Sequence, residues 1–281
     1  MHPLIEAFRS VAVFLDEDEA GRTTGPDLGA LARWVVAWDA WYRRTTGIDA
    51  GRRRHLMYRR EVGVATAIRL EQWEGLRAVA GVCQALGVGW GLTLDGRDAS
   101  RDAEAARSMF AEGLIQAVAL SYGPDEALPA NTADLVAAAF DLNLRVTLVG
   151  SMRRFLESGV LSAPGVNGRH LTLEPTLPVT LRDVLDASEP CFRRFRVLVD
   201  PSGDLYPCAG LLGLRHLRLG NISESFEETV FGRGRGPLEL NALATCGPAI
   251  GLGRDQPVTS TGLPLLCDLH RAQLEEAGGP A

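Results

Sequence analysis

Lysine is missing from this chain of 281 residues, so its 29 basic residues are all arginine. The formal net charge is -6 at pH 7. A mildly acidic protein has no broad electrostatic attraction to nucleic acid or anionic membranes, so we expect neither as a partner. Runs of about 18 continuous apolar residues are also missing, which argues against a membrane-spanning helix. Residues 1–18 lack the basic segment and apolar run of a secretory signal, and we expect a cytoplasmic protein.

Cysteine is scarce in the first two thirds of the chain. Cys83 stands there alone, on the apolar side of an expected helix, and a buried small hydrophobe is its expected role. The remaining cysteines are Cys191, Cys208, Cys246 and Cys267. Because cytoplasmic thiols stay reduced, we expect these four to be free, catalytic or metal-bound rather than paired in disulfides.

Short β-rich runs alternate with longer helical patterns before residue 188. We expect strands at residues 10–15, 62–70, 89–94, 115–121, 145–150 and 170–173. We expect helices at residues 26–43, 72–86, 101–112, 132–142, 151–158 and 181–187. This alternation is typical of parallel βαβ units. The expected fold class is therefore α/β, as a partial (β/α) barrel of about six parallel strands or an open doubly wound sheet. In either case the chemistry is expected at the carboxyl ends of the strands.

The pattern changes near residue 188. Two β-rich runs flank Pro201, Ser202 and Gly203, which favour a tight turn, and the segment is expected to form a hairpin. Glycine-rich loops follow, and a last helix is expected at residues 264–277. We therefore expect a barrel domain at 1–187 and a small hairpin-plus-helix domain at 188–281.

The four late cysteines suit a shared metal centre. A hairpin between Cys191 and Cys208 would bring these two thiols near each other. Cys246 precedes a Gly-Pro turn, and Cys267 begins the last expected helix, where free amide groups favour a thiolate. Four thiolates are what a [4Fe–4S] or [2Fe–2S] cluster requires. Zinc is the alternative metal, although structural zinc sites usually contain ligands two to four residues apart, and the chain has no such cysteine pair.

The segment CFRRFRVLVDPSGDLYPCAG, followed by LGNI, resembles the opening of the SPASM and twitch domains. Those domains bind auxiliary [4Fe–4S] clusters at the C-terminus of many radical SAM enzymes. The matching positions are Cys191, Gly203 and Cys208, with LGNI at residues 219–222. The dense cysteine run that would hold a second cluster is missing. The resemblance therefore implies one [4Fe–4S] cluster, with Cys246 and Cys267 as its remaining ligands.

The first domain resembles the radical SAM barrel in outline but lacks the residues that define it. The family has a CxxxCxxC loop after its first strand, where residues 16–25 of this chain contain no cysteine. The family's Gly-Gly-Glu aligns with Arg69, Leu70 and Glu71, and its Thr-Asn-Gly with residues 94–96. The resemblance thus implies a degenerate fold in which reductive cleavage of S-adenosylmethionine is not expected, and binding of this cofactor is kept only as an alternative.

A few polar residues outside the cysteine set are candidates for a pocket. Glu71, Asp95 and Arg97 lie at expected strand ends, and Glu71 and Asp95 are the candidate catalytic groups if the barrel acts on a small molecule. His270 lies three residues after Cys267 and is a candidate second donor, although an exposed helix histidine is the expected state.

Two charged runs are expected to be solvated surface rather than binding sites. One is the acidic run at residues 16–19, and the other comprises the arginines and histidine between Arg52 and Arg60.

These features lead to one functional expectation and two alternatives. We expect an iron–sulfur protein that is an accessory or electron-transfer partner of a complete radical SAM enzyme acting on a peptide or natural product. One alternative is an enzyme of altered, non-radical chemistry that binds a small-molecule substrate in the barrel. The other is a zinc-stapled binding module.

Overall fold

The computed structural model describes residues 10–17, 23–46, 60–123, 126–163, 165–166, 171–175, 197–206 and 218–226. The chain divides into two compact units. One is formed by residues 61–177, and the other, called the split unit below, joins residues 1–60 with residues 178–281. The expected boundary near residue 188 lies outside the described residues.

The 61–177 unit is built on a parallel sheet. Its strands are β4 (Glu61–Ile68), β5 (Gly89–Asp95), β6 (Ala117–Ser121), β7 (Arg145–Gly150) and β8 (Leu171–Pro175). They lie side by side in chain order, and each described pair is parallel. A register shift in β4 between Val64 and Ala67 marks a bulge.

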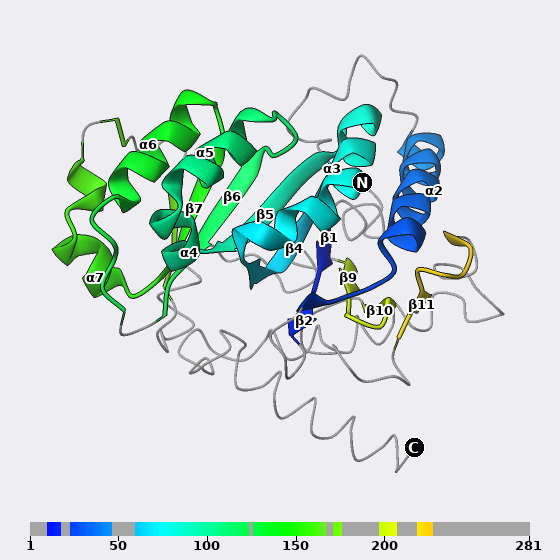
Figure 1. Cartoon of the computed structure of the whole chain (residues 1–281). Coiled ribbons are helices and arrows are strands. Elements are labelled where there is room, and N and C mark those ends of the chain that lie inside the picture. The colour runs from blue at the N-terminus through cyan, green and yellow to red at the C-terminus, as the bar shows by residue number, and fades with distance from the viewer. Residues whose placement is uncertain are drawn as a thin grey trace, which may run out of the picture. The chain divides into compact units, whose positions relative to one another are not determined.

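Helices connect these strands and cover one face of the sheet. They are α3 (Trp73–Leu86), α4 (Gly96–Arg101), α5 (Ala103–Ala111), α6 (Thr132–Asp141) and α7 (Met152–Glu157), with the short helices η3 (Leu70–Gln72) and η4 (Val160–Ser162). Figure 1 shows α3, α5 and α6 in front of strands β4 to β7. Burial alternates along the strands, with Val62, Leu92, Val118 and Leu148 among the buried set, as expected for a sheet that packs one face on helices.

The split unit holds a second set of strands. These are β1 (Ser10–Val13), β9 (Val197–Val199), β10 (Asp204–Tyr206) and β11 (Gly220–Asn221), and a two-stranded ribbon of β2 (Asp16–Glu17) and β3 (Thr23–Thr24). β9 is parallel to β1, while β10 is antiparallel to both β9 and β11. The hairpin expected in the last third of the chain is formed by β9 and β10, and its first strand lies beside β1.

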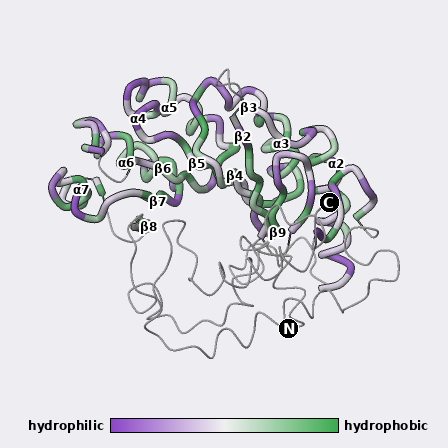
Figure 2. The backbone as a smooth tube through the Cα atoms, turned by 90° about the horizontal axis from the view of Figure 1, so that it is seen from below, coloured by the Kyte–Doolittle hydropathy of each residue, from purple (hydrophilic) through white to green (hydrophobic). Residues whose placement is uncertain are grey.

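Helix α2 (Leu28–Thr46) buries one apolar side, which includes Leu31, Trp34, Val35, Trp38 and Trp41. Asp27 caps its start, because its carboxylate accepts hydrogen bonds from the amides of Gly29 at 2.8 Å and Ala30 at 3.0 Å. The rings of Trp34 and Trp41 each lie 5.3 Å from the ring of Phe226, which follows β11. Figure 2 shows the hydrophobic residues concentrated along the strands and the inner sides of the helices.

The sequence analysis predicted most of these elements. The expected α/β class with parallel strands is confirmed, and all six expected strands before residue 188 are present. The helix expected at residues 101–112 is present as α5, while the short helix α4 before it was not expected. The two helices are separated at Asp102, whose side chain caps α5 by accepting a hydrogen bond from Ala105 N at 3.1 Å. The helices expected at 181–187 and 264–277 lie outside the described residues.

None of the helices in the described part of the chain is both long enough and apolar enough to cross a bilayer.

Candidate functional site

The hairpin of β9 and β10 turns through a tightly bonded loop. One carboxylate oxygen of Asp200 accepts hydrogen bonds from Ser202 N at 2.9 Å, Ser202 Oγ at 2.7 Å and Asp204 N at 2.9 Å. Gly203 has a φ of 85°, a left-handed conformation that favours glycine. The turn expected from Pro201, Ser202 and Gly203 is therefore confirmed, and glycine is required at its third position.

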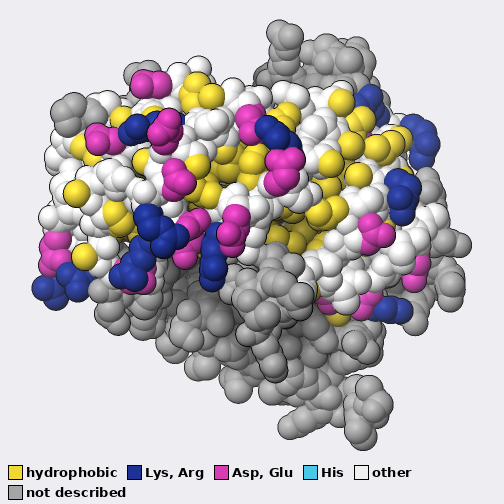
Figure 3. Space-filling model, viewed as in Figure 1, with side chains coloured by type: hydrophobic (Ala, Val, Ile, Leu, Met, Phe, Trp, Pro, Cys, Tyr) yellow, Lys and Arg dark blue, Asp and Glu magenta, His cyan; other side chains and the backbone are white. Residues whose placement is uncertain are grey.

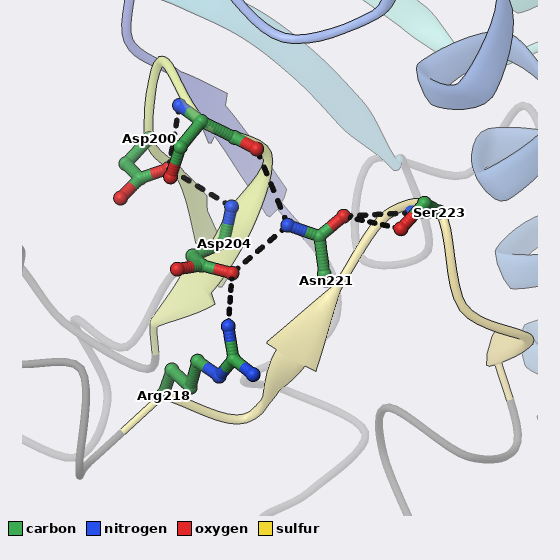
Figure 4. A network of polar contacts seen from close by, with 6 residues as sticks. Asp200, Asp204, Arg218, Asn221 and Ser223 are labelled. Atoms are coloured by element: carbon green, nitrogen blue, oxygen red, sulfur yellow. Dashed lines mark hydrogen bonds and ion pairs between the residues drawn. The ribbon is translucent and has the colours of Figure 1, made fainter.

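Strand β11 fastens this turn from the other side. Asp204 lies opposite Asn221, and Leu205 lies opposite Gly220. Asn221 Nδ2 donates to Asp204 Oδ1 at 2.9 Å, and Arg218 reaches the same oxygen at 2.8 Å, as Figure 4 shows. The two segments that carry the family resemblance, around Gly203 and at residues 219–222, thus form one three-stranded structure.

This structure is anchored in the core of the split unit. Val197, Val199, Leu205 and Tyr206 are buried. The amide of Phe14, just after β1, donates to Val199 O at 2.8 Å. The hairpin is consequently held by a parallel strand on one side and by β11 on the other.

The four candidate metal ligands, Cys191, Cys208, Cys246 and Cys267, lie outside the described residues, as does His270. Strand β9 begins six residues after Cys191, and β10 ends two residues before Cys208. Because Leu198 pairs with Tyr206, the start of β9 and the end of β10 lie at the same open end of the hairpin. In the described ranges themselves, no group of three or more His, Cys, Asp or Glu side chains could hold a metal ion.

Cys83 has the structural role expected of it. Its side chain is fully buried in α3, and burial raises the pKa of its thiol to about 12. A thiol that remains protonated and enclosed is neither a nucleophile nor a metal ligand at neutral pH.

The loop after β1 is closed by local pairing. Strands β2 and β3 pair antiparallel, with Asp16 opposite Thr24, before α2 begins. Two members of the acidic run, Asp16 and Glu17, are therefore part of a strand, while residues 18 and 19 lie outside the described residues.

Asp95 and Asp98 organise the carboxyl ends of β4 and β5. Asp95 caps α4 by accepting hydrogen bonds from Arg97 N at 2.9 Å and Asp98 N at 3.0 Å. Asp98 in turn accepts from Leu70 N at 2.8 Å and so ties the loop after β4 to the loop after β5. The contacts of these two carboxylates therefore indicate a structural role, which is to stabilise two loops.

The other two pocket candidates are exposed. The side chain of Glu71 is 75% exposed and lies 4.0 Å from Arg69, too far for a direct hydrogen bond. The side chain of Arg97 is 60% exposed and forms an ion pair with Glu126 at 3.1 Å. Figure 3 shows acidic and basic side chains interspersed among the described residues on this side.

A buried group of hydroxyls at the same strand ends was missed in the sequence analysis. Tyr122, after β6, donates to Thr132 Oγ1 at 3.3 Å, and the Ser100 hydroxyl lies 3.4 Å from the same oxygen. Burial raises the pKa of Tyr122, and its hydrogen bonds to Thr132 and Ser100 oppose this rise. Gly96 makes room for the ring, because a β-carbon on it would lie 2.4 Å from Tyr122. The three hydroxyls join the segments that follow β5 and β6.

The expectation of a solvated arginine run was wrong for its last member. Arg60 is only 3% exposed and forms an ion pair with the buried Asp39 of α2. Its guanidinium lies 5.2 Å from the centre of the Tyr42 ring. The preceding residues 52–59 lie outside the described residues.

Comparison with known proteins adds no relative. No family model matches the chain, and no curated protein shows significant sequence similarity to it.

Proposed function

We propose that this protein binds one [4Fe–4S] cluster through Cys191, Cys208, Cys246 and Cys267 and is an accessory or electron-transfer partner of a complete radical SAM enzyme. The substrate class of that enzyme would be a peptide or a natural product. The expectation of a partial barrel of about six parallel strands belongs to the same proposal.

One observation carries the proposal. The hairpin that separates Cys191 from Cys208 has a glycine turn at Gly203, and β11 at residues 219–222 is bonded to it. The chain enters β9 and leaves β10 at the same end of this bonded unit, which supports the proposal that the thiolates on either side of it share one site. The chemistry of the donor set fits as well, since four thiolates complete the coordination of a cluster.

An accessory role is favoured over catalysis by the residues around the first strands. No cysteine precedes Cys83, so the three thiolates needed to present S-adenosylmethionine to an iron are not available before the hairpin. The backbone amide of Leu70 is bonded to Asp98 and that of Arg69 to the Gln72 side chain, so these amides are occupied within the protein. Non-radical catalysis by Glu71 and Asp95 is less favoured, because Glu71 is exposed and Asp95 caps a helix.

Anaerobic reconstitution with iron and sulfide tests the proposal. The wild-type chain should gain the broad visible absorption of an iron–sulfur cluster and about four irons. Cys191→Ala and Cys208→Ala should each lose it, while Cys83→Ala, the matched control, should keep it. A folded wild type that takes up no iron would refute cluster binding, and one zinc per chain would favour the zinc-stapled module.

The accessory role has its own test. The reconstituted protein should leave S-adenosylmethionine intact in the presence of a strong reductant. Turnover of S-adenosylmethionine that requires the reduced cluster would refute the accessory assignment and leave cluster binding in place.

A further inference from the structure

An ion pair in the 61–177 unit joins two strands that are not neighbours. Arg145 begins β7 and Glu61 begins β4, and β5 and β6 lie between them. Arg145 Nη2 nevertheless donates to Glu61 Oε1 at 2.6 Å. The side chains of Arg145 and Glu61 are 46% and 33% exposed, so water and dissolved ions reach the contact.

This contact requires the sheet to curve. Strands in a sheet lie about 4.8 Å apart and rise about 3.3 Å per residue. The register places Arg145 level with Gly63, which is two residues after Glu61. In a flat sheet the backbones of Arg145 and Glu61 would be about 16 Å apart, which is farther than the two extended side chains can reach. The four strands must therefore curl toward the face on which the ion pair lies.

The ion pair lies on the face opposite the described helices, called the open face below. Burial alternates along β7, where Val146 and Leu148 are buried and Arg145 is exposed. The same alternation in β4 buries Val62 and leaves Glu61 half-buried. Figure 1 shows α3, α5 and α6 together on one side of these strands. Because successive residues of a strand point to opposite faces, the buried set packs on the helices and the charged pair is on the other side.

The two central strands carry only short side chains on the open face. These are Gly91 and Thr93 of β5 and Ala117 and Ala119 of β6, and all four residues are half-buried. In closed (β/α) barrels, layers of large branched side chains fill the concave face and hold the strands in their curve. The short side chains of β5 and β6 supply no such layer. The Arg145–Glu61 pair is thus a described contact that spans the concave side of the sheet.

We propose that Arg145 and Glu61 form a clasp that holds the curvature of strands β4 to β7 at their amino ends. The proposal concerns the 61–177 unit alone and does not depend on the metal centre. Since the pair is partly exposed, salt weakens it, and at about 1 M salt the screening length falls to about 3 Å. The clasp should therefore loosen reversibly as the ionic strength rises.

Hydrogen exchange of the full-length protein, measured peptide by peptide with mass spectrometry, tests the clasp. At low salt, Arg145→Met and Glu61→Gln should each raise the exchange rates of β5 and β6 about threefold, as expected for the loss of one partly exposed ion pair. The two changes together should add little, because either one already opens the contact. Arg153→Met is the matched control, since its ion pair with Glu157 lies within α7, and it should leave β5 and β6 unchanged.

Salt and a reversed pair separate the clasp from general stability. Wild-type β5 and β6 in about 1 M salt should exchange as fast as they do in the single variants at low salt. Arg145→Glu combined with Glu61→Arg restores the pair in the opposite sense and should return the rates to near the wild-type values. Wild-type rates in Arg145→Met would overturn the inference, as would a reversed pair that restores nothing. An equal rise in α5 and α6 would also overturn it, because the pair would then stabilise the whole unit rather than the curvature of its sheet.

Discussion

Gly203 lies so close to Ile222 that a β-carbon on the glycine would be 3.0 Å from Cγ1 of the isoleucine. The same glycine has a φ of 85°. Gly203→Ala should therefore lower the free energy of unfolding of the split unit by about 1–3 kcal/mol, through backbone strain and crowding together. Urea unfolding monitored by tryptophan fluorescence measures this, because Trp34, Trp38 and Trp41 lie in that unit.

Gly81 in α3 is the matched control for that substitution. A β-carbon on Gly81 would meet nothing within 4 Å, and alanine is a better helix former than glycine. Gly81→Ala should be neutral or stabilise the protein by up to about 1 kcal/mol. Equal behaviour of the two variants would contradict the geometry of the hairpin turn.

Gly96→Ala should destabilise the 61–177 unit because the new methyl group would overlap the buried Tyr122 ring. The expected loss is about 1–3 kcal/mol, the usual cost of overpacking a core. Addition of Tyr122→Leu to Gly96→Ala should then cost less than Tyr122→Leu costs in the wild type. If the two substitutions changed the free energy of unfolding additively, in thermal or urea unfolding, the ring and the glycine would not be in contact.

The thiol of Cys83 should be unreactive in the folded protein. Because burial raises its pKa to about 12, its thiol stays protonated at pH 8, where an ordinary cysteine is partly ionised. Alkylation with iodoacetamide followed by peptide mass spectrometry should leave Cys83 unmodified in folded protein and modified in urea. Rapid modification of Cys83 in the folded protein would contradict its burial.

Burial of the Cys83 thiol also makes the free energy of unfolding depend on pH. The unfolded chain ionises Cys83 at its ordinary pKa of about 9, before the folded chain does. Its contribution is therefore complete below about pH 9 and falls as the pH rises toward about 12. The difference in unfolding free energy between the wild type and Cys83→Ala should decrease over this range.

Asp39→Asn should be strongly destabilising. It would leave the buried Arg60 guanidinium without its carboxylate, and breaking a buried ion pair on one side costs about 3–5 kcal/mol. Burial already lowers the pKa of Arg60 to about 10, so the group stays charged at neutral pH. The double variant Asp39→Leu with Arg60→Met should lose much less stability in urea unfolding, because it removes both charges of the buried pair and takes from Arg43, whose side chain is 31% exposed, only its contact with Asp39. A double variant as unstable as Asp39→Asn would show that the pair is not the cause.

The local pattern of the sequence was sufficient to predict the elements that form locally. Alternating burial marks β4 to β7, and the turn residues mark the hairpin. The start of α5 was placed two residues too early because Asp102, which caps α5, was assigned to the helix itself. Recognising Asp102 as a helix cap, whose side chain can accept from the amide of Ala105 three residues later, would have predicted the start of α5.

Long-range partners could not be predicted from local pattern. The parallel pairing of β1 with β9 joins residues 11–13 to residues 197–199, which are far apart along the chain. The burial of Arg60 depends on Asp39 from helix α2, so a run of arginines gives no sign of it. The hydroxyl group of Tyr122, Thr132 and Ser100 was missed for the same reason. The cysteine assignment lies outside the described residues and stays a prediction.

The most direct measurement is the iron, sulfide and zinc content of the protein purified without exposure to oxygen. The proposal predicts about four irons and about four sulfides per chain, with little zinc. A well-folded chain containing neither iron nor sulfide, even after anaerobic reconstitution, would contradict it.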